Sequence, residues 1–109
     1  MILKNLLGKN TFMDLSIEQI VKYVCRDMKV SERQILGKSR TMEVALARQL
    51  AMFLSKELTS ASLANIGIHI GGRDHSTVIH ACKNIEKKAN SDSDFQRNIE
   101  NMKNEISEQ

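Results

Sequence analysis

The chain has 109 residues and a formal net charge of +3, and 41% of its residues are hydrophobic but only 4% are aromatic. This length suits a single domain. The sequence holds no secretory signal and no apolar run of about 18 residues, so we expect a soluble cytoplasmic protein without a membrane span. Proline is absent and helix-forming residues dominate, which favours an all-α fold, a small helical bundle.

Charge is distributed unevenly along the chain. Residues 38–88 hold eight basic and four acidic side chains, whereas residues 89–109 hold two and five. A positive excess in the middle of a chain is typical of a nucleic-acid-binding face, although ordinary solvated surfaces share it.

The first nine residues predict a short amphipathic helix with leucine and isoleucine on one side. We expect residues 1–15 to form a linker helix and loop that pack on the following domain or on a segment upstream. Contact of residues 1–9 with a membrane surface is the alternative. Residues 16–109 are expected to form one helical domain.

Polar capping residues and apolar periodicity predict three helices between residues 16 and 58. Ser16 begins the first helix. Ser31 begins a short second helix that ends at Gly37, and Thr41 begins a long third helix. In this long helix the residues expected to face the core are Val44, Ala47, Leu50, Ala51, Leu54 and Leu58. Those expected to lie off the core-facing stripe are Arg48, Gln49, Met52 and Lys56.

A helix-turn-helix arrangement is predicted between residues 62 and 89. Ser62 begins a helix that runs to Ile70. Gly71 and Gly72 then suit a turn that needs positive φ, and Asp74 begins a longer helix. The buried stripe of that helix is expected to consist of Val78, Ala81, Cys82 and Ile85. Its first turn would stand free, as in a recognition helix that offers side chains to DNA bases.

The remaining sequence predicts a break at residues 90–93 and a closing helix. The closing helix has one apolar stripe, formed by Phe95, Ile99, Met102 and Ile106. Cys25 and Cys82 each lie on an apolar helical face. We expect both to be buried, reduced thiols, in preference to a disulfide or a metal pair.

The sequence gives little support to an enzyme. Gly67 and Gly72 have the spacing of a phosphate-binding loop, but Arg73 and Asp74 replace its Lys-Ser/Thr pair. The metal candidates are His69, His75, His80 and Cys82, and their spacing scatters them around the helix instead of placing them at i, i+4. We therefore expect a binding domain without catalysis, metal or cofactor of its own.

Duplex DNA is the ligand that the polar and basic residues favour. His75, Ser76 and Thr77 lie at a helix start, where side chains commonly read bases. Arg40 lies in a loop from which it can reach a groove. Phosphate contacts are expected from Arg48, Lys56 and Arg73.

The stretch GGRDHSTVIHA at residues 71–81 closely resembles the signature of the C-terminal DNA-binding domain of the bacterial replication initiator DnaA. The resemblance extends back through LGKSR at 36–40, VALARQLAM at 44–52 and LTSASLANIG at 58–67, and covers roughly residues 16–89. It implies a Trp-repressor-like all-α fold with a helix-turn-helix. It also implies double-stranded DNA as the partner, bound at the DnaA boxes of the replication origin, and a place in the cytoplasm on the nucleoid.

The resemblance also implies roles for individual residues. Arg40 would enter the minor groove. Major-groove base contacts are implied for Asp74, His75, Ser76 and Thr77, with Leu63 and Ala64 near thymine methyls. Phosphate contacts are implied for Lys38, Thr41, Arg48, Gln49, Lys56, Leu58, Thr59 and Arg73. ATP and contacts with other copies of the initiator would belong to an ATPase domain that this sequence lacks, so we expect the isolated domain to be a monomer.

Three departures from the family pattern bear on affinity. Ser39, Thr41 and Met42 occupy places in the basic loop where Arg or Lys is common. Each lost phosphate contact should flatten the log–log salt slope by about 0.9. Ala64 stands where proline is common. Ser76 stands where threonine is common, and the missing methyl should cost less than about 1 kcal/mol.

Three other readings stay open. A protein-interaction module would use the stripe of the closing helix to dock a partner helix. An enzyme fragment is the second. The third is a complete small relative that binds the same boxes and represses transcription.

Overall fold

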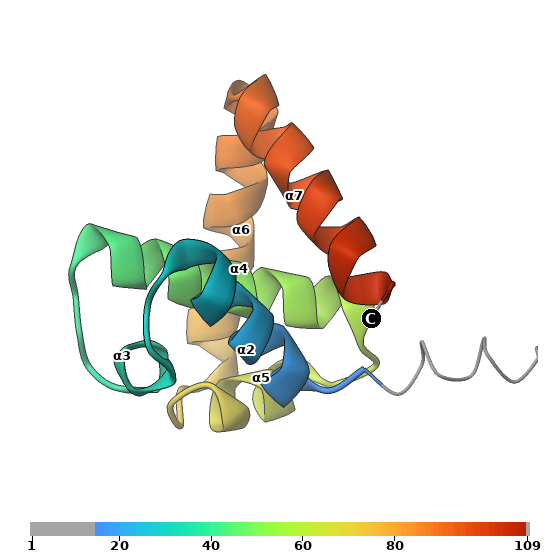
Figure 1. Ribbon diagram of the computed structural model, residues 1–109. Coiled ribbons are helices and arrows are strands. Elements are labelled where there is room, and N and C mark those ends of the chain that lie inside the picture. Colours follow the sequence, from blue (N-terminus) through green and yellow to red (C-terminus); the bar gives the residue numbers. More distant parts are fainter. Residues whose placement is uncertain (1–14, 109) are drawn as a thin grey trace, which may run out of the picture.

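The computed structural model describes residues 15–108, so the predicted linker helix at residues 1–9 lies outside the described residues. This part of the chain is all-α, as predicted, and Figure 1 shows its helices packed around α4. The helices are α2 (Ile17–Met28), α3 (Glu32–Leu36), α4 (Met42–Leu58), α5 (Leu63–His69), α6 (His75–Ser91) and α7 (Ser93–Ser107).

The helix starts coincide with the predicted capping residues. The Ser16 hydroxyl accepts a hydrogen bond from the backbone N–H of Gln19 at 3.1 Å, and Ser31 does the same for Gln34 at 3.0 Å. In both cases the glutamine side chain accepts from the backbone N–H of the serine, which completes a capping box. Thr41, Ser62 and Asp74 cap α4, α5 and α6 through a side-chain oxygen that accepts from the N–H three residues on, without the reciprocal bond of a capping box.

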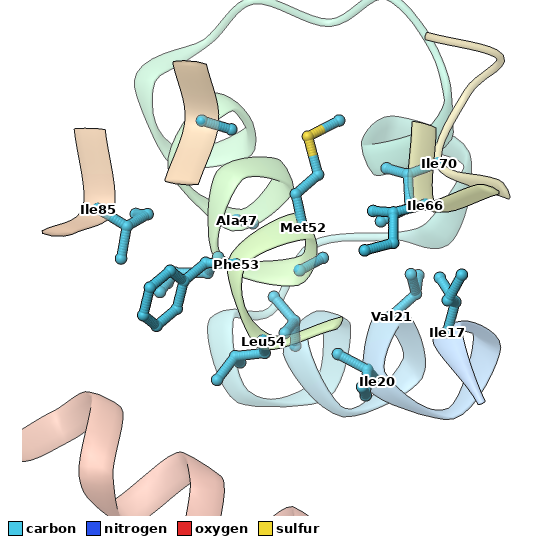
Figure 2. Packing of buried hydrophobic residues seen from close by; sticks show 14 of the residues in the cluster. Ile17, Ile20, Val21, Ala47, Met52, Phe53, Leu54, Ile66, Ile70 and Ile85 are labelled. Atoms are coloured by element: carbon cyan, nitrogen blue, oxygen red, sulfur yellow. The ribbon is translucent and has the colours of Figure 1, made fainter. Parts of the chain in front are cut away.

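The central helix is α4, which contacts α2, α3, α5, α6 and α7. Six consecutive residues, 50–55, are buried, so this stretch of the helix is covered on all sides. In Figure 2, Leu54 lies on the face of α4 that is turned toward α2, the helix that carries Ile20. Phe53 lies toward Ile85 of α6. The expectation that Met52 lies off the core-facing stripe is wrong. Met52 is 1% exposed because helices cover α4 on more than one face.

The last two helices meet at one residue. The predicted break at residues 90–93 is too wide, because α6 continues to Ser91 and only Asp92 lies between it and Ser93. The Asp92 carboxylate accepts from the backbone N–H groups of Asp94 and Phe95, both at 3.1 Å. Asp92 therefore ends one helix and caps the next.

The apolar stripe of α7 is used inside the fold. Ile99, Met102 and Ile106 are buried in the common core, so they do not form the free docking face of an interaction module. The Tyr23 hydroxyl of α2 donates to the Glu105 carboxylate of α7. On the other side, the Lys103 ammonium lies 3.2 Å from a Glu57 carboxylate oxygen of α4. These contacts attach α7 to α2 and α4.

Both cysteines are free thiols, Cys82 buried and Cys25 half-buried, and burial raises the pKa of each. Between residues 15 and 108, none of the helices has the length and apolar character needed to cross a bilayer.

Candidate nucleic-acid interface

The predicted helix-turn-helix is formed by α5, the turn at residues 70–74 and α6. Gly71 has φ +85° and Gly72 has φ +66°, which confirms the expected positive φ at both glycines. Gly67 in α5 is buried, and a Cβ atom there would overlap the carbonyl oxygen of Arg73. The Arg73 N–H donates to the Gly67 carbonyl at 2.8 Å. Backbone contact between α5 and the turn therefore fixes the angle at which α6 begins.

The first turn of α6 projects into solvent. Val78, Ala81, Cys82 and Ile85 are buried, as predicted, and they anchor the helix to the core. The predicted base-reading residues precede this stripe at the free end of the helix and are all exposed: Asp74, His75, Ser76 and Thr77. These side chains are therefore free to meet a groove.

Asp74 and Thr77 are bonded to each other. One Asp74 carboxylate oxygen accepts from the Thr77 N–H and from the Thr77 hydroxyl, both at 3.1 Å. These hydrogen bonds hold the pKa of Asp74 below its usual value. In the free protein Asp74 is thus an ionised cap, and the Thr77 hydroxyl is held in a fixed orientation.

The basic loop, residues 37–41, connects α3 to α4. Lys38 and Arg40 are exposed there, and Met42 at the start of α4 is 88% exposed. Thr41, a predicted phosphate contact, uses its hydroxyl oxygen to accept from the Val44 N–H at 3.4 Å. The loop therefore presents two cations beside one large apolar side chain.

Both arginines that are predicted to contact phosphates from outside the basic loop donate hydrogen bonds within the protein. The Arg48 guanidinium donates to backbone carbonyl oxygens of α3 and of the basic loop. The Arg73 guanidinium donates to the carbonyls of Ile70 and Gly37. Sequence periodicity gives no sign of these contacts, because they join residues from separate elements.

A cleft of about 210 Å³ between α4 and α6 brings several candidate residues together. Predicted contact residues in its lining are Arg48, Gln49, Arg73 and Thr77. His80 and Asn84 also line it, and sequence reasoning did not select either for DNA. Their spacing from Thr77, three and seven residues, places all three on one helical face and could have identified them.

The remaining candidates lie where α4 ends and α5 begins. Lys56 and Ala64 are exposed, whereas Leu58, Thr59 and Leu63 are half-buried. The Thr59 hydroxyl donates to the Ser55 carbonyl at 2.7 Å and accepts from the Ala61 N–H at 3.1 Å. This group is separated from the basic loop by the length of α4, 17 residues or about 25 Å. The start of α6 lies against the middle of α4, between the two groups.

No cluster of three metal-ligating side chains occurs within residues 15–108.

A helix-turn-helix with a free first turn, flanked by cations at both ends of α4, defines the class: a helix-turn-helix DNA-binding domain. The family model described as "Bacterial dnaA protein helix-turn-helix" matches residues 17–85. The chain belongs to that family.

Similar proteins support the same assignment. The chain is 44% identical over 104 residues to "Chromosomal replication initiator protein DnaA" of Chlorobaculum tepidum, which covers 95% of this chain and 21% of the relative. The protein of that name from Thermodesulfovibrio yellowstonii is 44% identical over 88 residues, covering 81% of this chain and 20% of the relative. The protein of that name from Geotalea daltonii is 37% identical over 105 residues, covering 96% of this chain and 23% of the relative. The chain therefore spans about a fifth of the length of these curated relatives.

Proposed function

We propose that this chain binds double-stranded DNA sequence-specifically at the DnaA boxes of a replication origin and anchors the initiator there. The observation that carries the proposal is the exposed first turn of α6, at residues 74–77, in a domain that also exposes Arg40 in the basic loop. In this proposal the chain acts as a monomer in the cytoplasm, on the nucleoid. Nucleotide binding and contacts with other initiator copies belong to other parts of the parent protein.

The arrangement along α4 fits a site of less than one DNA turn. About 25 Å separates the two ends of α4, against about 34 Å for one turn of B-DNA. Arg40 enters the minor groove at one end, and the first turn of α6 enters the adjacent major groove. Leu63 and Ala64 approach thymine methyls near the other end. The proposed phosphate contacts lie around these groups: Lys38, Thr41, Arg48, Gln49, Lys56, Leu58, Thr59 and Arg73.

Fluorescence anisotropy with two duplexes, one carrying a DnaA box and one with that box scrambled, tests the proposal at several salt concentrations. We expect box-dependent binding.

Arg40→Ala and His75→Ala should each cost about 1–3 kcal/mol of binding free energy on the box duplex and reduce the discrimination between the box and scrambled duplexes. Lys56→Ala is the matched phosphate control, because its side chain is exposed at the end of α4. It should weaken both duplexes alike and lower the salt slope by about 0.9.

Each variant has an outcome that would contradict its proposed role. Equal losses on the two duplexes for Arg40→Ala or His75→Ala would remove the base-reading role. A loss confined to the box duplex for Lys56→Ala would argue against a phosphate contact. No binding of the unaltered chain to either duplex at low salt would reject DNA as the ligand.

A further inference from the structure

The Arg48 side chain connects three elements. From the second turn of α4, its Nε donates to the Ile35 carbonyl at 2.7 Å. Its Nη2 lies 2.8 Å from the Gln34 carbonyl oxygen and 3.1 Å from those of Gly37 and Ser39. One guanidinium therefore contacts the C-terminal end of α3 and the basic loop on both sides of Lys38.

Arg73 reaches the same point from the helix-turn-helix. Its Nη1 donates to the Ile70 carbonyl at 3.0 Å, within the turn before α6. Its Nη2 donates to the Gly37 carbonyl at 2.6 Å, which also accepts from Arg48. The arginine pair, Arg48 and Arg73, thus joins the basic loop to the turn that positions α6.

Backbone packing at the glycines leaves little room for the loop to shift. A Cβ atom on Gly71 would lie 2.7 Å from the Leu36 carbonyl oxygen and would overlap the Arg73 guanidinium. A Cβ atom on Gly37 would lie 2.7 Å from the Arg33 carbonyl oxygen. The turn and the end of α3 are therefore in direct contact beside the arginine pair.

The environment of Arg48 differs from that of a solvated phosphate-binding side chain. Arg48 is half-buried, and burial together with the nearby Arg73 charge lowers its pKa. Backbone carbonyl dipoles offset the repulsion between the two guanidinium groups. By comparison, Lys56 and Arg40 are exposed and have no such partners among the hydrogen bonds of residues 15–108.

We infer that Arg48 and Arg73 are positioning residues that hold the basic loop in fixed relation to α6, so that Arg40 and the first turn of α6 meet DNA together. This inference rests on the proposed function for the role of Arg40. A loop that is already ordered loses less conformational freedom when it binds, so the arginine pair raises box affinity through the position of Arg40, separately from any phosphate contact of its own.

The test uses Arg48→Lys and Arg73→Lys, which keep the charge but remove the planar fork that reaches several carbonyls. Arg48→Lys should weaken binding to the box duplex about tenfold, the scale of losing Arg40. It should change scrambled-duplex affinity by less than about twofold and leave the salt slope unaltered, because no phosphate charge is lost. On an Arg40→Ala background the same substitution should have little further effect. Arg97→Lys, the same substitution at an exposed site of α7 outside the proposed DNA contacts, is the control and should be neutral.

A second measurement needs no DNA. Backbone NMR order parameters of residues 37–41 in the free chain should fall in both lysine variants, because the carbonyl groups of the loop lose their guanidinium partners, while those in the core of α4 stay high. High order parameters in the core also show that each variant is folded. If the unaltered chain fails to distinguish box from scrambled duplex, the proposed function fails, yet the order parameters still test the arginine pair.

Any of three results would overturn the inference. The first is full box affinity for Arg48→Lys while Arg48→Ala weakens both duplexes and lowers the salt slope, which assigns Arg48 to a phosphate contact alone. The second is unchanged order parameters in residues 37–41 of both lysine variants. The third is an equal loss for Arg48→Lys with and without Arg40, which contradicts a role that acts through Arg40.

Discussion

Asp74 combines two tasks at one carboxylate. It caps α6 through the Thr77 N–H, and it stands exposed in the turn that we propose meets the major groove. Its pKa lies below the ordinary value because the hydrogen bonds from Thr77 favour the ionised form. The cap is therefore strongest when the carboxylate is charged, which makes its contribution to stability depend on pH.

The sign of that dependence follows from linkage. A folded-state pKa below the unfolded value near 3.8 means that the stabilisation is complete at neutral pH and is lost as pH falls through the folded pKa. Asp74→Asn keeps a capping oxygen but does not titrate. We expect the melting temperature of the unaltered chain to fall more steeply than that of Asp74→Asn between about pH 5 and about pH 2. Parallel melting curves over this range would show that the Asp74 cap contributes no pH-dependent stability.

Residue-scale features differ in how far sequence can predict them. The caps at Ser16, Ser31 and Asp74 were predictable because each involves a partner three residues away. The bonds of the arginine pair were not, because Arg48 reaches carbonyls 9 to 14 residues back and Arg73 reaches Gly37 across 36 residues. No local pattern encodes such a contact. The DNA roles of the candidate residues stay predictions.

At the scale of elements, the junction between α6 and α7 is the place where sequence reasoning was least accurate. Asn90, Ser91 and Ser93 are polar and suggested a four-residue break, but exposed helical positions accept polar residues equally well. The buried positions of α6 and α7 decide where the chain turns, and the structure reduces the break to Asp92. Figure 1 shows the two helices folding back on each other from this point.

This junction supports a prediction about α7. Asp92→Ala removes the acceptor for the N–H groups of Asp94 and Phe95 and should lower the free energy of unfolding by about 1 kcal/mol, measured by urea denaturation. Asp94→Ala is the control. Its ion pair with Arg97 joins side chains that are 84% and 70% exposed, so its loss should cost about 0.5 kcal/mol or less. Similar losses for the two variants would contradict the capping role of Asp92.

For the whole molecule, the acidic side chains at the start of α7 lie far from the proposed DNA-binding end. The basic loop and the start of α6 lie at one end of α6, whereas Asp92 and Asp94 lie at the other, together with Lys87 and Lys88, 17 residues or about 25 Å away. That distance exceeds two Debye lengths at physiological salt, which are about 8 Å each. Asp92 and Asp94 are thus screened from DNA bound at the other end.

Two substitutions that each remove one negative charge test this separation. Glu43→Gln lies in the first turn of α4, beside the basic loop, and should strengthen binding to both duplexes. Asp94→Asn, at the start of α7, should leave both affinities within about twofold at 0.15 M salt. Anisotropy titrations of the two variants give the comparison. Equal strengthening would mean that the net charge of the domain, and not its distribution, governs binding.

The central place of α4 has a consequence for the newly made chain. Its apolar faces are covered in part by α6, whose last residue, Ser91, follows Leu58 by 33 positions (91 − 58). At about 5–20 residues per second, a ribosome needs about 2–7 s to add them. During that interval α4 leaves the ribosome before the helix that covers it. We expect α4, and residues 50–55 above all, to be where chaperones bind the nascent domain.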